Sequence, residues 1–209
     1  MGKTNRNIQS RFDQHRSPLV FVLSGPSGVG KDTVLNRLKK ARGDLQYVTT
    51  VTTRPRRPKE QDGIDYSFVS AEKFHALLQQ KELLEWACVY GNWYGVPKKS
   101  VRLALEEGRD SIIKVDIQGA ANIKKAIPQA ILIFLMPPSM EELTHRLQKR
   151  HTETRFDLKL RTKTAVEEMN KLPEFDYKVV NNQDKVDNAV ADIEAIIKSV
   201  RQRGEQTCL

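Results

Sequence analysis

A glycine-rich segment, SGPSGVGKDT at residues 24–33, constrains the fold of this chain more than any other stretch. The run LVFVLS before it, Leu19–Ser24, is almost entirely apolar, which is typical of a strand buried on both faces. After it, Val34, Leu35 and Leu38 recur at helical spacing. A glycine-rich turn between a strand and a helix points backbone N–H groups at the helix N-terminus, where anions bind. The segment therefore predicts a phosphate-binding loop, with a tight strand-to-helix turn as the alternative that this setting disfavours.

The loop fits the pattern G-x-x-x-x-G-K-[ST] at every position except the last. Gly25 and Gly30 stand where the backbone must approach phosphate closely, and Lys31 is placed to reach the phosphate oxygens. Asp32 takes the place of the hydroxyl residue that meets Mg²⁺ in this pattern. The loop is thus predicted to be a nucleotide site with one substituted ligand.

Apolar segments alternate with helical patterns along most of the remaining chain. SIIKVDI at 111–117, AILIFLM at 130–136 and YKVVN at 177–181 are each followed by a helix-period stretch. This alternation predicts an α/β fold with a central parallel sheet flanked by helices. Residues 50–95 break the rhythm and are expected to form an inserted lobe, and the arginine-bearing residues 146–161 a mobile flap.

Composition narrows the class of protein without choosing a ligand. The chain has 209 residues and a net charge of +9, which suits nucleic acid, an anionic membrane or a polyanionic small substrate. The basic residues 1–17 are expected to be a mobile leader, with an RNA-binding arm as the alternative. Cys88 and Cys208 show no disulfide or metal spacing, and no apolar run could span a bilayer, so we expect a cytoplasmic location and no membrane.

A second group of cations stands in TTRPRRP, residues 52–58. Pro55 and Pro58 hold Arg54, Arg56 and Arg57 out of a helix. Arginine forks in a fixed extended backbone suit bidentate recognition of a second phosphate. A solvated run of charge is the alternative, and this segment taken alone favours it.

Seven motifs in order resemble guanylate kinase over residues 18–200: SGPSGVGKDT, TTRPRRP, DGIDYSFVS, LLEWACVYGNWYG, VDIQGA, LMPPS and RLQKRHTET. The resemblance implies a P-loop NTPase core, with an inserted GMP-binding lobe and a lid, that uses ATP and Mg²⁺ to phosphorylate GMP and dGMP. It implies these boundaries: leader 1–17, guanylate kinase-like domain 18–205, core 18–49 with 96–145 and 162–203, GMP-binding lobe 50–95, and lid 146–161.

The resemblance also implies the roles of single residues. Those expected at ATP are Gly25, Pro26, Ser27, Gly28, Val29, Gly30, Lys31, Asp32 and Thr33. Those expected at the GMP phosphate are Arg54, Arg57, Tyr66 and Tyr94, and those expected at guanine are Thr50, Glu85 and Asp116. Guanine presents two adjacent donors, which one carboxylate such as Glu85 accepts, whereas adenine presents an acceptor to the same group.

The same resemblance implies the catalytic residues, which are Lys31, Arg54, Arg146, Arg150 and Arg161. Such arginines neutralise the phosphoryl group in transfer, a task of positioning and electrostatics. No general base is required, because a phosphate monoester with a second pKa of about 6 is already largely dianionic at neutral pH. ATP and GMP are the expected partners without nucleic acid, and a monomer and a homodimer both remain open.

Four residues depart from the family pattern: Asp32, Lys114, Val96 and His151. Asp32 is a hard oxygen ligand, so metal binding is expected to persist there, and its charge is expected to make nucleotide binding more dependent on Mg²⁺. Thr33 falls on another helix face and is a poor substitute. Lys114 replaces an acid, Val96 removes a hydroxyl near the base, and His151 replaces a glycine of the flap.

Two rival interpretations belong to other classes. One is a guanylate-kinase-like interaction module without catalysis, but such modules typically lose the loop lysine or the lid arginines, which this chain retains. The other is a kinase of a different small phosphate ester on the same scaffold. Glu85 with Thr50 disfavours that kinase, since a base-reading carboxylate would then have no partner.

Overall fold

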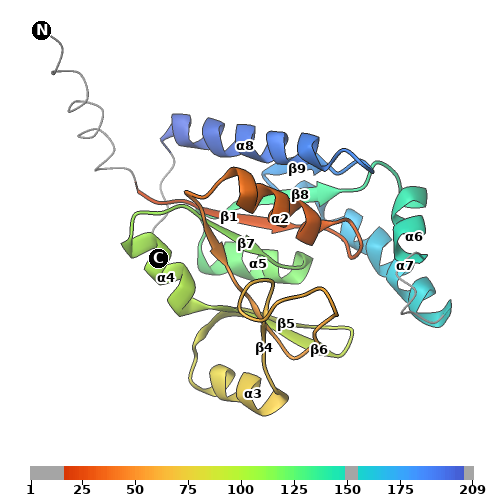
Figure 1. The fold of residues 1–209 in the computed structure, drawn as a ribbon, viewed down its shortest axis with the longest axis horizontal. Coiled ribbons are helices and arrows are strands. Elements are labelled where there is room, and N and C mark those ends of the chain that lie inside the picture. Colours follow the sequence, from red (N-terminus) through yellow and green to blue (C-terminus); the bar gives the residue numbers. More distant parts are fainter. Residues whose placement is uncertain (1–16, 149–154, 205–209) are drawn as a thin grey trace, which may run out of the picture.

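The computed structural model describes residues 17–148 and 155–204, with the backbone alone for residues 155–160. Two sheets and their helices make up this part of the chain (Figure 1). The elements are β1 (Val20–Ser24), α2 (Lys31–Ala41), β2 (Gln46–Val48), β3 (Val51–Thr52), β4 (Ser67–Phe68), α3 (Ala71–Gln79), β5 (Leu83–Val89), β6 (Asn92–Pro97), α4 (Lys98–Glu106), β7 (Ser111–Lys114), α5 (Ile117–Ala126), β8 (Ile131–Met136), α6 (Met140–Gln148), α7 (Arg155–Met169), the short 3₁₀ helix η2 (Leu172–Glu174), β9 (Tyr177–Val180) and α8 (Val186–Arg203).

The central sheet has five strands in the order β2-β7-β1-β8-β9, and each neighbouring pair is parallel. The predicted parallel α/β sheet is therefore confirmed. Strand β1 is central, and all its side chains are buried. Phe21 and Leu23 belong to the hydrophobic cluster on one face of the sheet, and Val20 and Val22 to the cluster on the other. A strand covered on both faces needs apolar residues at every position, which explains its unbroken run.

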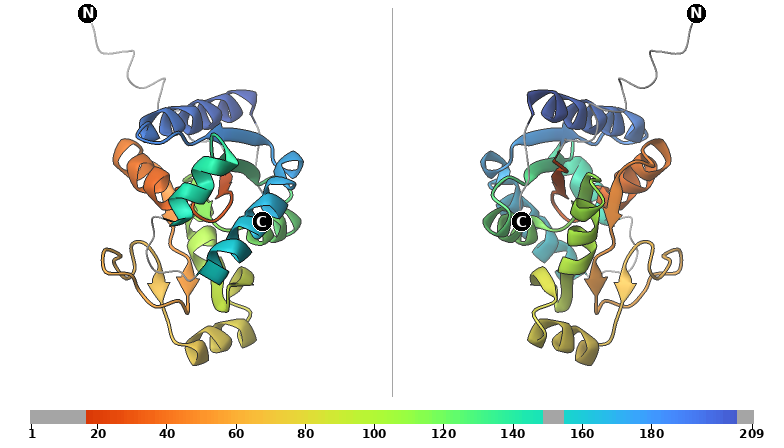
Figure 2. Two further views of the ribbon diagram at one scale, coloured as in Figure 1. Left: turned by 90° about the vertical axis from the view of Figure 1, so that its right-hand side faces the viewer. Right: turned by 90° about the vertical axis from the view of Figure 1, so that its left-hand side faces the viewer.

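Helices cover both faces of this sheet (Figures 1 and 2). On one side α2 and α8 lie next to each other and bury Leu38 and Ile193 against Phe21 and Leu23. On the other side α4 and α5 supply Val101 and Ile123 to the second cluster. The glycine-rich loop follows the carboxyl end of β1 and leads into α2.

The second sheet has four strands in the order β4-β3-β6-β5 and forms a lobe with α3 below the central sheet in Figure 1. Its core is small, with Phe74 fully buried between Val51 and Leu83. Strands β5 and β6 form an antiparallel hairpin that carries both tryptophans of the chain. The rings of Trp86 and Trp93 are 5.4 Å apart. The chain enters this lobe after β2 and returns to the central sheet through α4.

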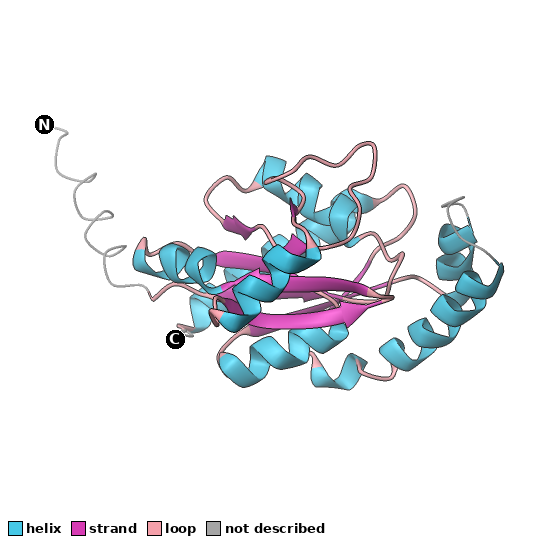
Figure 3. Ribbon diagram, turned by 90° about the horizontal axis from the view of Figure 1, so that it is seen from below, coloured by secondary structure: helices cyan, strands magenta, loops and turns pink. Residues whose placement is uncertain are grey.

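Helices α6 and α7 contact each other and extend beyond one end of the central sheet (Figure 3). They carry the residues expected to form the lid, of which Arg150 and His151 lie outside the described residues. None of the helices in the described ranges is both long and apolar enough to cross a membrane.

Candidate active site

One pocket gathers residues from both sheets at the carboxyl end of β1, where ligands bind in open α/β sheets. The glycine-rich loop forms one side, the lobe forms the opposite side, and the start of α5 and helix α7 contribute between them. Its lining residues are Pro26, Ser27, Gly28, Gly30, Lys31, Asp32, Thr50, Arg54, Arg57, Tyr66, Glu85, Val89, Tyr90, Tyr94, Gly95, Lys114, Val115, Asp116 and Glu168. All seven residues expected at GMP therefore line the same pocket as the loop.

The loop has a backbone that only glycine accommodates at two of its turns. Gly25 has a φ of +146°, and a Cβ there would lie 2.1 Å from the carbonyl oxygen of Leu135. Gly30 has a φ of +99° and precedes α2, so no side chain of its own caps the first N–H groups of that helix. Such uncapped N–H groups at a helix N-terminus attract anions. Thr33 is exposed and does not line the pocket.

Lys31 folds its side chain back over the loop. Its Nζ donates hydrogen bonds to the carbonyl oxygens of Gly25 at 2.5 Å and Pro26 at 3.2 Å. Burial lowers the pKa of Lys31, although the nearby carboxylates of Glu168 and Asp32 oppose that effect. The ammonium is thus held against the backbone of the loop, beside the helix N-terminus that attracts anions.

Asp32 forms an ion pair with Lys114, which lies 82 residues further along the chain at the end of β7. The Asp32 side chain is 44% exposed, whereas that of Lys114 is 6% exposed. The ring of Tyr66 lies 3.9 Å from the Lys114 ammonium. Two of the departures from the family pattern are therefore in contact with each other. The expectation about Mg²⁺ dependence treated the charge of Asp32 alone, and Lys114 supplies the opposite charge beside it.

Asp32 is the acidic residue of the loop that could meet Mg²⁺. In nucleotide sites Mg²⁺ is bound by one or two carboxylates, substrate phosphates and water. Within residues 17–148 and 155–204, no three His, Cys, Asp or Glu side chains gather as a metal cage. Asp32 is a hard oxygen donor that lines the pocket and keeps part of its surface exposed. The site therefore fits Mg²⁺ held mainly by ATP, with Asp32 as the protein ligand.

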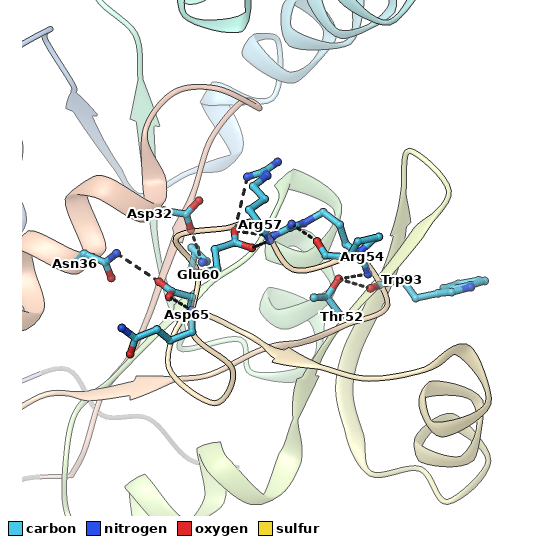
Figure 4. Close-up of polar contacts among 11 residues, drawn as sticks. Asp32, Asn36, Thr52, Arg54, Arg57, Glu60, Asp65 and Trp93 are labelled. Carbon is cyan, nitrogen blue, oxygen red and sulfur yellow. Dashed lines mark hydrogen bonds and ion pairs between the residues drawn. The ribbon is translucent and has the colours of Figure 1, made fainter. Parts of the chain in front are cut away.

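On the lobe side, Glu60 holds the two arginines expected at the GMP phosphate (Figure 4). Its Oε1 accepts a hydrogen bond from Arg54 Nη2 at 2.8 Å, and its Oε2 accepts one from the backbone N–H of Arg57 at 2.8 Å. The Thr52 hydroxyl accepts from the Arg54 N–H at 3.1 Å and donates to the Trp93 carbonyl oxygen at 2.9 Å. These bonds fix the non-helical segment that contains Pro55 and Pro58.

Two tyrosines complete this cationic corner. The rings of Tyr66 and Tyr94 meet edge to face at 6.1 Å, and both line the pocket. The Arg54 guanidinium lies 5.5 Å from the centre of the Tyr66 ring. Burial raises the pKa of Tyr66, so its hydroxyl stays protonated and is available as a hydrogen-bond donor at neutral pH.

Glu85 is a buried carboxyl group at the far end of the pocket. Its side chain packs against Gly119 in the first turn of α5, where an added Cβ would lie 3.0 Å from Oε2. Oε2 is buried and has no hydrogen-bond partner within the described residues. Burial and, to a smaller degree, the charge of Asp116 raise the pKa of Glu85 to about 8. A buried acceptor without a partner, facing a pocket, is the mark of a group that awaits a donor from a ligand.

The residues near Glu85 differ in whether they line the pocket. Asp116 caps α5, where its Oδ1 accepts from the Gly119 N–H at 2.7 Å, and Thr50 is buried on the pocket wall. Val96 pairs with Glu85 across the hairpin, yet its side chain is fully buried in the core under the central sheet. The missing hydroxyl at Val96 therefore leaves an apolar side chain that packs with the core.

The lid arginines differ in position. Arg146 does not line the pocket, because its guanidinium donates to the carbonyl oxygen of Val29 in the loop at 3.2 Å and to that of Asn181, directly after β9, at 3.0 Å. Arg161 lies 4.8 Å from the ring centre of Tyr90, at the turn of the β5–β6 hairpin. Helix α7 thus contacts the lobe, and α6 contacts the loop.

The sequence did not predict several residues of the site, among them Glu168, Glu60 and Gly119. Glu168 of α7 lines the pocket, and its Oε2 accepts from the Ser27 N–H at 3.4 Å, so a carboxylate lies beside the loop. Burial raises the pKa of Glu168, while Lys31 and the Ser27 N–H act in the opposite sense. Glu60 follows the motif TTRPRRP, and Gly119 lies in the motif VDIQGA. A single acid or glycine at such a position does not by itself indicate a site residue.

A phosphate-binding loop that faces a second cationic corner across one pocket defines a P-loop nucleoside monophosphate kinase. The family model described as guanylate kinase matches residues 17–200. The chain therefore belongs to the guanylate kinase family, whose members phosphorylate GMP with ATP. Neither a non-catalytic module nor a kinase of another ester is favoured.

Individual relatives agree with this placement. The chain is 45% identical to a guanylate kinase of Caldanaerobacter subterraneus subsp. tengcongensis, with 86% of each chain covered. It is 44% identical to a protein of Oryza sativa subsp. japonica named guanylate kinase 2, chloroplastic/mitochondrial, and covers 66% of that protein's length against 89% of its own. A solved guanylate kinase from Anaplasma phagocytophilum superposes with a TM-score of 0.74 at 33% identity, covering 88% of this chain and 86% of that one.

Proposed function

We propose that this pocket binds ATP at the loop and GMP in the lobe, and that Glu85 selects guanine. The observation that carries this proposal is Glu85, which lines the same pocket as Lys31 and whose buried Oε2 has no hydrogen-bond partner among the described residues. Cationic side chains line the pocket between Lys31 and Glu85, which suits two phosphate groups that meet there. Residues 50–95 are the proposed GMP-binding lobe and residues 146–161 the proposed lid.

On the ATP side, the backbone N–H groups of residues 25–33, apart from Pro26, and the ammonium of Lys31 would hold the β and γ phosphates. Asp32 would be the protein ligand of Mg²⁺, which, when bound with ATP, neutralises phosphate charge. Lys31 lies against two loop carbonyl oxygens, and it would exchange them for phosphate oxygens. Asp32 pairs with Lys114 and its side chain is 44% exposed, and it would bind Mg²⁺ from the exposed side.

On the GMP side, Arg54, Arg57, Tyr66 and Tyr94 would bind the phosphate. Glu60 now occupies the guanidinium of Arg54, so a dianionic phosphate would share or replace that contact. Glu85, Thr50 and Asp116 would bind the base. For Glu85 to accept from both guanine donors it must be ionised, so GMP binding would expel its proton to solvent.

During transfer, Lys31, Arg54 and the lid arginines Arg146, Arg150 and Arg161 would stabilise charge on the phosphoryl group. Arg161 is held at the lobe by Tyr90, which suits closure of α7 over the pocket. Arg146 would act from behind the loop, where it fixes the Val29 carbonyl. Water exclusion on closure would suppress hydrolysis of ATP.

The location and assembly of the protein belong to the same proposal. Cys88 is a free, exposed thiol, which suits a reducing cytoplasmic compartment. The proposed partners are ATP and GMP, with no nucleic acid required, because their phosphates would neutralise the basic side chains that line the pocket. The protein would act as a monomer or a homodimer.

The experiment that tests this proposal measures ADP formation with GMP, dGMP, AMP, CMP or UMP as acceptor, across a Mg²⁺ titration. We expect turnover with GMP and dGMP that requires Mg²⁺ and that is abolished in Lys31→Ala. Asp32→Ser serves as the matched variant with the hydroxyl of the family pattern. Turnover that prefers AMP, or that persists in Lys31→Ala, would contradict the assignment.

A further inference from the structure

Lys114 is a cationic residue of the pocket that the proposed function leaves without a task. It is the last residue of β7 and lies directly beside Leu23 of β1 in the sheet register. Its side chain is 6% exposed and lines the pocket. Its ammonium forms an ion pair with the carboxylate of Asp32. The side chain is therefore a buried cation.

The contacts of Lys114 place this cation between the two halves of the site. On one side it pairs with Asp32 of the loop, and on the other it lies over the ring of Tyr66, which belongs to the lobe. Arg54 approaches the same ring at 5.5 Å. Two cations thus flank the tyrosine that is assigned to the GMP phosphate. A phosphate bound by the Tyr66 hydroxyl and the Arg54 guanidinium would lie within reach of Lys114, because the Lys114 ammonium contacts the same Tyr66 ring.

Asp32 explains how such a cation stays ordered before substrate binds. An isolated buried ammonium is unfavourable, and a carboxylate partner offsets its loss of water. Because Asp32 is partly exposed, it tolerates the loss of this partner better than Lys114 does. The lysine can accordingly exchange one anionic partner for another as a phosphate arrives.

We propose that Lys114 is a further substrate-contacting residue, whose ammonium binds the phosphate of GMP at the junction between the loop and the lobe. This inference rests on the proposed function, because it requires GMP in the lobe. It gives the Asp32–Lys114 pair a joint role: Asp32 holds the cation in place, and the acceptor phosphate recruits it.

The experiment compares GMP with guanosine, which has the same base and ribose but no phosphate. Affinities of the full chain are measured by titration calorimetry for GMP and by competition against GMP for guanosine. In Lys114→Met we expect GMP to bind about ten-fold or more weakly, the range of a charge-assisted hydrogen bond, with guanosine within about two-fold of the parent. Lys114→Arg should recover part of the GMP affinity.

Lys39→Met is the matched control. Lys39 also lies in this region, but its Nζ donates to the Ile64 carbonyl oxygen at 3.2 Å and it does not line the pocket. The Lys39→Met variant also loses one positive charge, and its GMP affinity should stay within about two-fold of that of the parent. If Lys114→Met fails to fold, the double variant with Asp32→Asn removes both charges and is compared in the same way.

Equal weakening of GMP and guanosine, or no weakening of either, would overturn the role of Lys114. A parent protein that binds GMP no better than guanosine would instead overturn the phosphate corner of the proposed function, and the inference with it. A loss confined to GMP that Lys39→Met does not reproduce supports the proposal.

Discussion

The ATP loop and the GMP lobe meet in one pocket but are built in different ways. The loop is shaped by backbone, with Gly25 against Leu135 and Gly30 at the start of a helix packed on the main core. The lobe has a small core, and its binding groups are charged side chains that contact one another, such as Arg54 with Glu60. The comparison teaches that the loop is preformed, whereas the lobe keeps its charges satisfied internally until a substrate replaces those contacts.

The largest effect is expected from a change in the loop backbone. Gly25→Ala places a Cβ 2.1 Å from the Leu135 carbonyl oxygen at a φ that L residues rarely adopt. We expect ATP binding and turnover to be lost and the protein to be destabilised by about 2 kcal/mol or more. Gly43→Ala, where nothing lies within 4 Å of an added Cβ, is the matched control. Calorimetric ATP titration and thermal unfolding measure both, and normal ATP affinity in Gly25→Ala would refute the preformed loop.

The next effect is expected from the guanine-facing end of the lobe. Glu85→Gln keeps the shape of the side chain but presents an N–H₂ group to one of the guanine donors, so kcat/KM for GMP should fall about 100-fold. AMP should improve relative to GMP. Glu82→Gln, an exposed acid just before the same strand, is the control. An unchanged ratio of GMP to AMP turnover would exclude Glu85 from base selection.

The raised pKa of Glu85 predicts how binding depends on pH. The free protein holds a proton on Glu85 below about pH 8, and ionised Glu85 is the form proposed to bind guanine. GMP affinity should therefore rise as pH rises from 7 to about 8, a range in which the phosphate is already dianionic. Calorimetry in buffers of different ionisation enthalpy should detect proton release at pH 7. Proton uptake, or a pH dependence that survives in Glu85→Gln, would contradict this assignment.

The same pKa predicts a stability effect of opposite sign. Folded Glu85 keeps its proton up to about pH 8, whereas the unfolded chain releases it near 4.5. The folded state thus binds more protons between these values, and the free energy of unfolding should fall as pH rises through them, by at most about 1.4 kcal/mol per pH unit. Thermal unfolding of Glu85→Gln should lack this part of the decline. A parent that gains stability from Glu85 as pH rises would show that the group is ionised when folded.

The smallest effect is expected at Glu60. Glu60→Ala frees the Arg54 guanidinium but also releases the segment that positions it, so the two consequences partly cancel. We expect the Kd for GMP to rise about three-fold to ten-fold, with ATP affinity unchanged. Glu72→Ala, on the outer helix of the lobe, should change neither. Tighter GMP binding in Glu60→Ala would mean that Glu60 mainly competes with the phosphate.

The sequence predicted most of the fold because its signals are local. Buried strands such as β1 require apolar residues at every position, and the loop requires its glycines, so both can be recognised in one short window. The pairing of Asp32 with Lys114 could not be recognised, since it joins residues 82 apart whose meeting depends on strand order. Glu168 reaches Ser27 from a helix 141 residues away, for the same reason. Local sequence patterns do not show such distant contacts, so the sequence alone presents Asp32 as a lone charge.

The hairpin that carries Glu85 also carries both indole rings of the chain. Trp86 is 46% exposed and tilts against Trp93, whose carbonyl oxygen anchors the segment leading to Arg54. Since no other tryptophan occurs in the 209 residues, light absorbed near 295 nm is emitted from this lobe alone. The protein therefore contains its own optical reporter of the GMP side, and a rapid-mixing record of its intrinsic fluorescence would follow lobe movement without any attached dye.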